Sequence, residues 1–373
     1  MTQPEYCGAI LTVDLDAIAE NYKLLRGTFT GAECAAVVKA DAYGLGARMV
    51  APALAKAGCK TFFVAHLQEA IDLRAILPEA GIHVLNGLAP GTGAVFAEHR
   101  LVPVLNSLGD LEAWKGFLES QSFKDVPPAD IHLDSGMLRL GLPPGEIDTL
   151  ANEPERLAGI NLTAVLSHLA CATELDHPLN PRHLKAFKQD LAKLPATPGT
   201  RVSFCGSSAI FLGPDYHFDL ARPGAALYGI NPLPGRPNPM RQTVRLQGKI
   251  LQVRDVDTPQ TVGYGATHRV TRKGKIATVA VGYADGFFRA LSNRGCGYIG
   301  DIRVPIVGRV SMDLITVDVG DVPSSQLFTG ALVELLGPDR DPDAVAEDAG
   351  TIGYEVLTAL GSRYHRAYVG GTD

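Results

Sequence analysis

Short apolar runs alternate with longer amphipathic runs over about the first 230 residues of the chain. This alternation is typical of repeated strand–helix units that build a parallel sheet. After a leading strand at Ala9–Val13, eight strands are predicted at Cys34–Lys39, Thr61–His66, Ile82–Asn86, Leu101–Asn106, Asp130–Asp134, Thr163–His168, Val202–Cys205 and Phe218–Arg222. Eight units in about 220 residues favour an α/β fold with a TIM-type (β/α)8 barrel.

Amphipathic segments between these strands predict the helices of the barrel. The first helix is expected to begin near Asp16, a residue type that favours the N-cap position, and to bury Ile18, Tyr22 and Leu25 on one face. Further helices are predicted at Met49–Ala57, Gln68–Ile76, Leu111–Glu119 and His183–Leu194.

A proline-rich segment, Asn231–Pro239, separates this region from a second one with a different pattern. Four prolines in nine residues exclude a helix or a central strand there and indicate a linker. Strands are predicted beyond it at Thr243–Val253, Lys275–Val281, Ile302–Val307, Ile315–Val319 and Ala331–Leu336, and helices after Asp341–Pro342 and within Thr351–Leu360. We therefore expect a barrel at residues 11–232 and a mostly antiparallel β domain at 233–373, with an N-terminal strand at 1–10 packing on the β domain.

Composition excludes several classes of function. The net charge of −6, without any basic run, argues against nucleic-acid binding. No apolar run approaches the roughly 18 residues of a membrane span, and the first residues lack the basic start of a signal peptide. Six cysteines without a Cys-x-x-Cys pair indicate reduced thiols in a cytoplasmic protein, and the ten histidines show no metal-binding spacing.

Each predicted barrel strand ends on a polar or reactive residue. The ends are Lys39, His66, Asn86, Asn106, Asp134, His168, Cys205–Ser208 and Arg222. A barrel places all its strand carboxyl ends on one face, where catalytic groups gather. The alternative is that polar residues only mark where strands give way to loops.

The segment Val37–Gly46 holds a lysine at the end of an apolar strand. A buried ammonium group is costly unless its charge is used or its pKa falls from about 10.4. This pattern favours a Schiff-base lysine that holds an aldehyde cofactor. The alternative is a lysine that reaches solvent from the strand end, with Gly44 and Gly46 as turn residues. Neither Gly44-x-Gly46 nor Gly91-x-Gly93 has the context of a dinucleotide-binding motif.

Two loops after the seventh and eighth strands could bind phosphate. Gly206–Ala209 offers hydroxyl groups, and Pro223–Ala226 offers backbone N–H groups that an anion can approach closely. Two tight turns would explain the same residues. Arg222 can donate a hydrogen bond but cannot protonate a partner nitrogen. Arg139 could bind a carboxylate in a two-pronged contact or form a surface ion pair.

In the second region, Val262–Thr267 places Tyr264 between two glycines, where its side chain could project into a cleft or lie on a hairpin surface. The segments Gly282–Gly286 and Gly308–Asp313 are similar glycine-bounded loops.

Together these segments resemble the alanine racemases, enzymes that depend on pyridoxal 5′-phosphate (PLP). The likeness covers nearly the whole chain and is most specific at Val37–Gly46. Further segments match family motifs in order, namely Asp134–Gly141, Ser167–His168, Ser207–Ser208, Ala221–Gly224, Gly263–Thr267, Gly282–Gly286, Ser311–Asp313 and Gly353–Glu355. The resemblance implies a PLP-binding barrel followed by a β domain, in a head-to-tail homodimer whose β domains complete the partner's active sites.

The resemblance also implies roles for individual residues. Lys39 would form the imine with PLP, and Arg222 would meet the pyridine nitrogen. His168 would orient Arg222 or support the catalytic tyrosine. The phosphate would be held by Tyr43, Ser208, Gly224, Ala225 and Tyr354. Arg139 and the backbone of Met312 would bind the substrate carboxylate, and the partner chain would supply Tyr264, Tyr283, Met312 and Asp313.

One position departs from the family pattern. Many members carry a lysine two residues before the aspartate of the Asp-Ser-Gly-Met motif, modified to a carbamate that braces the substrate-binding arginine. This chain has His132 there. An imidazole is not a carbamate anion, so a bound anion or another side chain is expected to brace Arg139.

The predicted activity is racemisation of alanine by two bases, Lys39 and Tyr264, on opposite faces of the α-carbon. It would supply D-alanine for peptidoglycan precursors or degrade it, and serine or longer amino acids are alternative substrates. A PLP decarboxylase is a second possibility, but it would have a carboxylate at the pyridine nitrogen and a catalytic cysteine. A non-catalytic PLP carrier would consist of a barrel alone.

Overall fold

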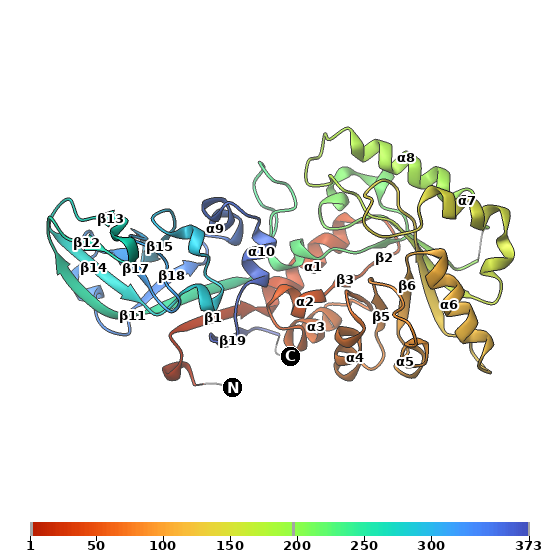
Figure 1. Ribbon diagram of the computed structural model, residues 1–373, viewed down its shortest axis with the longest axis horizontal. Helices are drawn as coiled ribbons and strands as arrows, with labels where there is room; N and C mark the ends of the chain where they lie inside the picture. The colour runs from red at the N-terminus through yellow and green to blue at the C-terminus, as the bar shows by residue number, and fades with distance from the viewer. Residues whose placement is uncertain (1–2, 196–197, 372–373) are drawn as a thin grey trace.

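The computed structural model describes residues 3–195 and 198–371 and contains a helix-covered barrel beside a β domain (Figure 1). Residues 1–2 and 372–373, which belong to the predicted segments 1–10 and 233–373, lie outside the described residues.

The barrel is built on a seven-stranded parallel sheet whose strands follow one another in chain order from β3 to β9. An eighth strand, β10 (Leu220–Ala221), pairs in parallel with β2 (Glu33–Cys34), and Ala35 N donates a hydrogen bond to Ala221 O at 2.8 Å. On its other side, Arg222 N donates to Cys205 O at 2.8 Å, which closes the ring. The remaining strands are β3 (Ala36–Val37), β4 (Thr61–Val64), β5 (Gly81–Val84), β6 (Val102–Leu105), β7 (Pro128–His132), β8 (Asn161–Leu166) and β9 (Arg201–Ser203). The predicted barrel fold is confirmed.

Seven helices cover the outside of this barrel in the described residues (Figure 1). They are α1 (Leu15–Thr28), α3 (Ala47–Lys56), α4 (Leu67–Ile76), α5 (Gly93–Glu98), α6 (Leu108–Glu119), α7 (Pro144–Asn152) and α8 (Leu179–Leu191), and all except α5 and α7 were predicted. The predicted start of the first helix near Asp16 was two residues late. Asp14 is the N-cap, because its carboxylate accepts a hydrogen bond from Ala17 N at 2.9 Å. Asp16 instead accepts one from Gly371 N.

The first barrel strand was predicted to reach Lys39 but ends at Val37. Lys39 begins a tight turn, α2 (Lys39–Tyr43), in which the four residues after the lysine have φ angles of 53–56°. Such left-handed backbone costs about 1–2 kcal/mol for each non-glycine residue. Lys39 therefore begins a strained turn that its surroundings must stabilise.

The second part of the chain forms an eight-stranded sheet that is mostly antiparallel, as predicted. Its long central strand β11 (Val244–Val256) pairs antiparallel with β14 (Gly274–Val279), β18 (Leu332–Leu336) and the N-terminal strand β1 (Ala9–Asp14). The other members are β15 (Cys296–Ile299), β16 (Ile302–Pro305), β17 (Ile315–Asp318) and β19 (His365–Val369), and a separate hairpin consists of β12 (Thr261–Val262) and β13 (His268–Arg269). The strands β12, β13, β15 and β19 were not predicted.

The two parts share one continuous hydrophobic core. Two helices of the second part, α9 (Pro342–Ala349) and α10 (Gly353–Thr358), lie at the junction, and α10 contacts α2 (Figure 1). Arg366 donates to Gly44 O at 2.6 Å, and the Tyr368 hydroxyl donates to Leu45 O at 3.0 Å. The turn that carries Lys39 is thereby attached to the β domain. The exact domain boundary at residue 232 stays a prediction.

No helix in residues 3–195 and 198–371 combines the length and the apolar character that crossing a membrane requires.

Candidate active site

The residues at the carboxyl ends of the barrel strands come together on one face. Lys39 follows β3, His132 ends β7, His168 follows β8 and Arg222 follows β10. Burial and the charges of Arg222 and Arg139 lower the pKa of His168 to about 3, so its imidazole is neutral near pH 7. These mutual effects place the predicted residues within electrostatic reach of one another.

The amine of Lys39 has a lowered pKa, which favours its unprotonated form. Burial lowers its pKa, the charge of Arg139 lowers it further, and Glu69 partly opposes the shift. Within the described residues, Lys39 Nζ makes neither a hydrogen bond nor an ion pair. A larger fraction of the lysine is therefore unprotonated near neutrality than in water, which makes it a better nucleophile and base.

Arg222 follows β10 on the same face of the barrel as Lys39, and hydrogen bonds hold its side chain in place. Its guanidinium donates to Ser203 Oγ and, at 2.6 Å, to Ser167 O. The group also lies 5.9 Å from the centre of the Phe63 ring. Burial lowers the pKa of Arg222 to about 10, which still leaves it cationic at pH 7. A fixed cation that only donates suits a ring nitrogen that accepts a hydrogen bond.

The predicted phosphate loops form a cradle of hydroxyl and N–H groups. Ser207 Oγ accepts hydrogen bonds from Gly224 N at 3.0 Å and Ala226 N at 3.2 Å. Among the described residues, no partner binds the hydroxyls of Tyr43, Ser208 and Tyr354. The rings of Tyr43 and Tyr354 lie 6.2 Å apart. Unpaired donors around a backbone loop fit a phosphate group, so these residues are suited to hold PLP.

A glycine is required at the base of this cradle. A Cβ atom at Gly224 would lie 2.3 Å from the Tyr43 hydroxyl. We therefore expect Gly224→Ala to displace Tyr43 and raise the dissociation constant of PLP by about 10-fold or more. The measurement is a titration of cofactor-free protein with PLP, followed by absorbance.

Gly27→Ala is the matched control, because an added Cβ there has no atom within 4 Å. Equal PLP affinity in the Gly224→Ala variant would show that this loop does not bind the phosphate.

His132 has a hydrogen bond that determines its tautomer. Its Nδ1 lies 2.9 Å from Asn106 Oδ1. The Asn106 amide nitrogen donates to Leu85 O at 3.0 Å and Val104 O at 2.9 Å, so Oδ1 must accept and His132 Nδ1 must carry the proton. Burial and Arg222 lower the pKa of His132 to about 4. His132 is therefore neutral, and its Nε2 is left as a hydrogen-bond acceptor.

Arg139 lies at the end of a turn built by Asp134. The Asp134 carboxylate accepts hydrogen bonds from Gly136 N at 2.9 Å, Met137 N at 2.9 Å and Leu138 N at 3.1 Å. The guanidinium of Arg139 is exposed and, within the described residues, forms neither a hydrogen bond nor an ion pair. It is free to bind a carboxylate that arrives from solvent.

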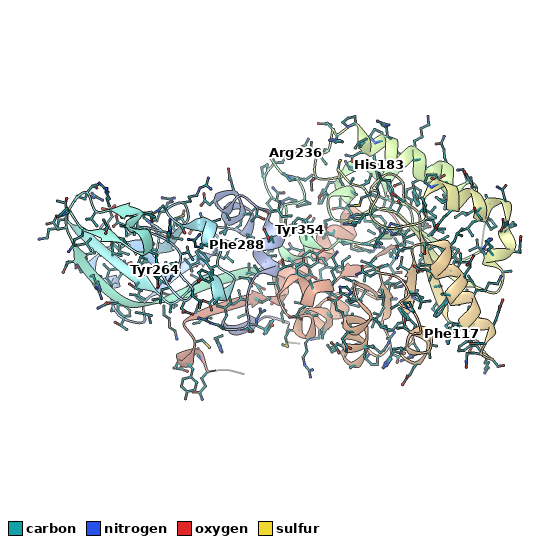
Figure 2. All side chains as sticks on the ribbon, viewed as in Figure 1. Phe117, His183, Arg236, Tyr264, Phe288 and Tyr354 are labelled. Atoms are coloured by element: carbon teal, nitrogen blue, oxygen red, sulfur yellow. The ribbon has the colours of Figure 1, made fainter. Side chains whose placement is uncertain are left out.

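The remaining predicted residues gather in the β domain. Tyr283 N donates to Ser311 O at 3.0 Å, and Ala284 N donates to Met312 O at 2.9 Å, which joins two of the glycine-bounded loops. Arg363 pairs with Asp313 at 2.7 Å. Tyr264, Tyr283 and Met312 have exposed fractions of 73%, 43% and 54%. Figure 2 shows Tyr264 in the β domain, well away from the barrel.

One chain therefore assembles two separate groups. The barrel face and α10 bring together Lys39, Tyr43, His132, Arg139, His168, Ser208, Arg222, Gly224, Ala225 and Tyr354, whereas the β domain holds Tyr264, Tyr283, Met312 and Asp313. Sequence reasoning missed two residues beside the first group. Asn106 was recognised only as a strand end, and Glu69 lies in the first turn of α4 just after the strand end at His66.

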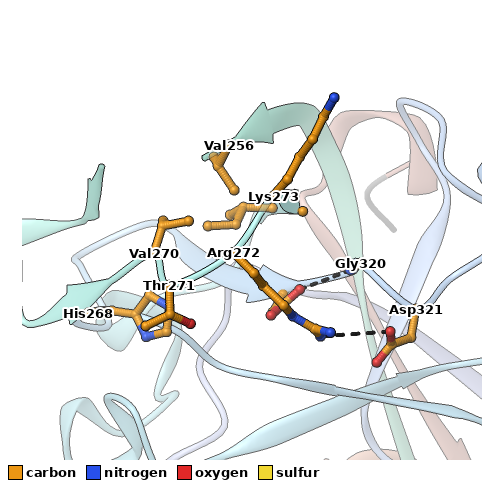
Figure 3. Close-up of a pocket in the computed structure, with 11 residues that line it drawn as sticks. Val256, His268, Val270, Thr271, Arg272, Lys273, Gly320 and Asp321 are labelled. Atoms are coloured by element: carbon orange, nitrogen blue, oxygen red, sulfur yellow. Dashed lines mark hydrogen bonds and ion pairs between the residues drawn. The ribbon is translucent and has the colours of Figure 1, made fainter. Parts of the chain in front are cut away.

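A cavity of about 130 Å³ lies at the far end of the β domain and contains none of the predicted site residues (Figure 3). It is lined by Val256, His268, Val270, Thr271, Arg272, Lys273, Gly274, Ile276, Asp318, Gly320 and Asp321. Its charged groups largely offset one another, with Arg272 3.8 Å from Asp321. In the described part of the chain, no cluster of three or more potential ligand side chains could hold a metal ion.

Comparison with known proteins places both parts of the chain in one family. Residues 13–232 match the family model described as alanine racemase, N-terminal domain, and residues 243–368 match alanine racemase, C-terminal domain. An alanine racemase of Rhodospirillum rubrum is 52% identical over 97% of this chain and 96% of that protein. A catabolic alanine racemase of Mesorhizobium japonicum is 48% identical over 98% of this chain and 94% of that protein.

Solved structures give the same result. Alanine racemase from Bartonella henselae, with covalently bound pyridoxal phosphate, superposes with a TM-score of 0.92 at 42% identity and covers 97% of this chain and 99% of that one. The biosynthetic alanine racemase of Pseudomonas aeruginosa has a TM-score of 0.89 at 35% identity, over 98% of this chain and 100% of that one.

Proposed function

The chain belongs to the alanine racemase family, and from this premise we propose that it interconverts L-alanine and D-alanine at the barrel face that carries Lys39. It is a PLP-dependent isomerase, as the sequence resemblance implied. The observation that carries the assignment is the unpaired amine of Lys39, with a lowered pKa, on the same face as Arg222 and the phosphate cradle.

The cofactor would be held by residues already in position. Lys39 would bond to its aldehyde carbon, and Arg222 would donate to its ring nitrogen while His168 supports this arrangement. The phosphate would lie among Tyr43, Ser208, Gly224, Ala225 and Tyr354. When bound, PLP supplies an electron system that delocalises negative charge from the α-carbon of an amino acid. Arg222 would leave the ring nitrogen unprotonated, because a guanidinium does not give up its proton readily.

The protein's own groups would bind the substrate and move its proton. Arg139 and the backbone N–H of Met312 of the partner subunit would hold the substrate carboxylate. Lys39, once free, would take or return the α-proton on one face of the carbon. Tyr264 of the partner subunit would act on the other face, because inversion requires bases on opposite sides. Tyr283 and Asp313 of the partner subunit would position this second set of groups.

We propose a head-to-tail homodimer because Tyr264 lies in the β domain (Figure 2), whereas Lys39 follows strand β3 of the barrel. Exposed apolar side chains mark both halves of the required contact. Leu138 and Leu140 flank Arg139 on the barrel, and Tyr264, Tyr283 and Met312 lie on the β domain. Packing these surfaces together would bury them and bring the two bases to one site.

We also propose a cytoplasmic location, because all six cysteines are unpaired thiols. The D-alanine produced would supply peptidoglycan precursors, and the reverse reaction would degrade D-alanine.

The test is racemisation by the purified protein with added PLP, on a panel of L-amino acids that includes alanine, serine and longer side chains. Chiral chromatography should show the fastest conversion with alanine and equal final amounts of its two enantiomers. Bound PLP without racemisation of any amino acid would contradict the proposal and favour a carrier.

His132 gives a further prediction about substrate binding. Its neutral Nε2 is an acceptor close enough to Arg139 for the charge of that guanidinium to help lower the His132 pKa, and we propose that the two groups form a hydrogen bond once the substrate is bound. We expect His132→Phe to raise the KM for alanine by about 10-fold, the effect of losing one hydrogen bond to a charged group, with a smaller change in kcat. Steady-state kinetics in both directions measure this. His132→Gln, which retains an acceptor, should recover most of the loss, and an unchanged KM in His132→Phe would exclude this role.

A further inference from the structure

Glu69, the third residue of α4, gathers three backbone N–H groups on one carboxylate. Oε2 accepts from Ala65 N at 2.9 Å and His66 N at 3.0 Å. Oε1 accepts from Ala40 N at 2.6 Å. The bond to His66 is an ordinary helix cap, in which a glutamate in the first turn binds the N-cap backbone. The bond to Ala40 joins residues 29 positions apart and is not part of any cap.

Ala40 directly follows Lys39 in the left-handed turn α2. The far end of this turn is held by several side chains, since Asp41 accepts from Ala47 N and Arg366 donates to Gly44 O. At the lysine end, Glu69 is the only side chain in the described residues that hydrogen-bonds the backbone between Val38 and Asp41. A strained turn keeps its shape only when its surroundings hold it, and this carboxylate is the side-chain contact at the lysine end.

We propose that Glu69 is a positioning residue, whose carboxylate ties the left-handed turn to the end of β4 and so aims Lys39 at the reacting carbon. The inference rests on the proposed role of Lys39 as cofactor lysine and base. The carboxylate also places a negative charge near the amine, where it opposes the positive field of Arg139.

The decisive variant is Glu69→Gln, which preserves the size of the side chain. The glutamine has one oxygen, whereas the carboxylate offers two oxygens to the three backbone N–H donors. Asp72→Asn is the matched control, since it makes the same chemical change on the exposed side of α4, where Asp72 accepts from Gln68 and from no other donor in residues 3–195 and 198–371. Glu69→Asp is a second variant, which retains the charge but is too short to reach all three donors.

We expect hydrogen exchange of the Ala40 amide to become at least about 10-fold faster in Glu69→Gln, because its acceptor is lost. We expect kcat to fall about 10-fold to 100-fold, as for a misplaced catalytic group, while the KM for alanine and the dissociation constant of PLP change less than about 3-fold. Glu69→Asp should behave like Glu69→Gln, and Asp72→Asn like the unaltered protein.

An unchanged exchange rate at Ala40 would overturn the proposal. So would faster exchange with an unchanged kcat, because Glu69 would then stabilise the turn without aiming the lysine. If the KM for alanine and the dissociation constant of PLP rose as much as kcat fell, the variant would be generally damaged, and this result would also count against the proposal. If the unaltered protein racemises no amino acid, the proposed function fails on its own, and the exchange rates then decide only whether Glu69 holds the turn.

Discussion

Lys39→Ala is expected to abolish the visible absorbance of the imine between PLP and the protein and to lower racemisation by at least about 1,000-fold, the scale of loss for a group that makes or breaks bonds in the reaction. The amine of Lys39 has no partner within the described residues, and burial lowers its pKa. Alanine cannot form a covalent bond to an aldehyde, and it cannot carry a proton. Absorbance spectra of the PLP-loaded protein and chiral assays in both directions measure the two effects.

Lys60→Ala is the control for this change. Lys60 is exposed and precedes β4, so it lies at the opposite end of the barrel from Lys39. Its replacement should leave the spectrum and the turnover unaltered. An unchanged spectrum in Lys39→Ala would mean that the cofactor lysine lies elsewhere, and the assignment of the whole barrel face would fail with it.

The barrel was predictable from sequence because its strands are buried on both faces and read as short apolar runs. Their order and their polar ends follow from the same pattern, which is why Lys39, His168 and Arg222 could be placed on one face. The turn after Lys39 was not predictable. None of the residues Ala40–Tyr43 is a glycine, and nothing in the local sequence indicates that they adopt left-handed backbone.

The supporting contacts were beyond sequence reasoning for another reason. The tautomer of His132 depends on Asn106, whose own amide is oriented by two backbone carbonyls. Glu69 resembles any glutamate in the first turn of a helix until Ala40, from a neighbouring strand end, is seen beside it. Such contacts depend on side-chain directions across the barrel and not on the periodicity of a single element. The departure at His132 could be noticed in sequence, but its consequence required the structure.

Tyr264→Phe is expected to lower turnover in both directions by about 1,000-fold, because it removes the proton carried on one face of the α-carbon. Racemisation needs both faces, whereas exchange of the α-proton with solvent needs only one. In deuterated water, the variant should therefore incorporate deuterium into one enantiomer of alanine and not into the other. Mass spectrometry after chiral separation measures this. Turnover retained in both directions at the level of the unaltered protein would exclude Tyr264 as the second base.

Combining the two variants tests whether the active site is shared. In a mixed dimer of Lys39→Ala and Tyr264→Phe chains, one site would lack both bases and the other would have both, if each site takes its lysine and its tyrosine from different chains. Such dimers, isolated with two different tags, should show about half of the activity of the unaltered dimer. If each chain supplied both bases to its own site, every site would lack one base and the mixed dimer would be inactive. The exposure of Tyr264 in a single chain favours the shared arrangement, because a catalytic phenol requires cationic neighbours to lose its proton near pH 7. We therefore expect the cation of Arg222 on the barrel face to provide this surrounding for a tyrosine that another chain brings in.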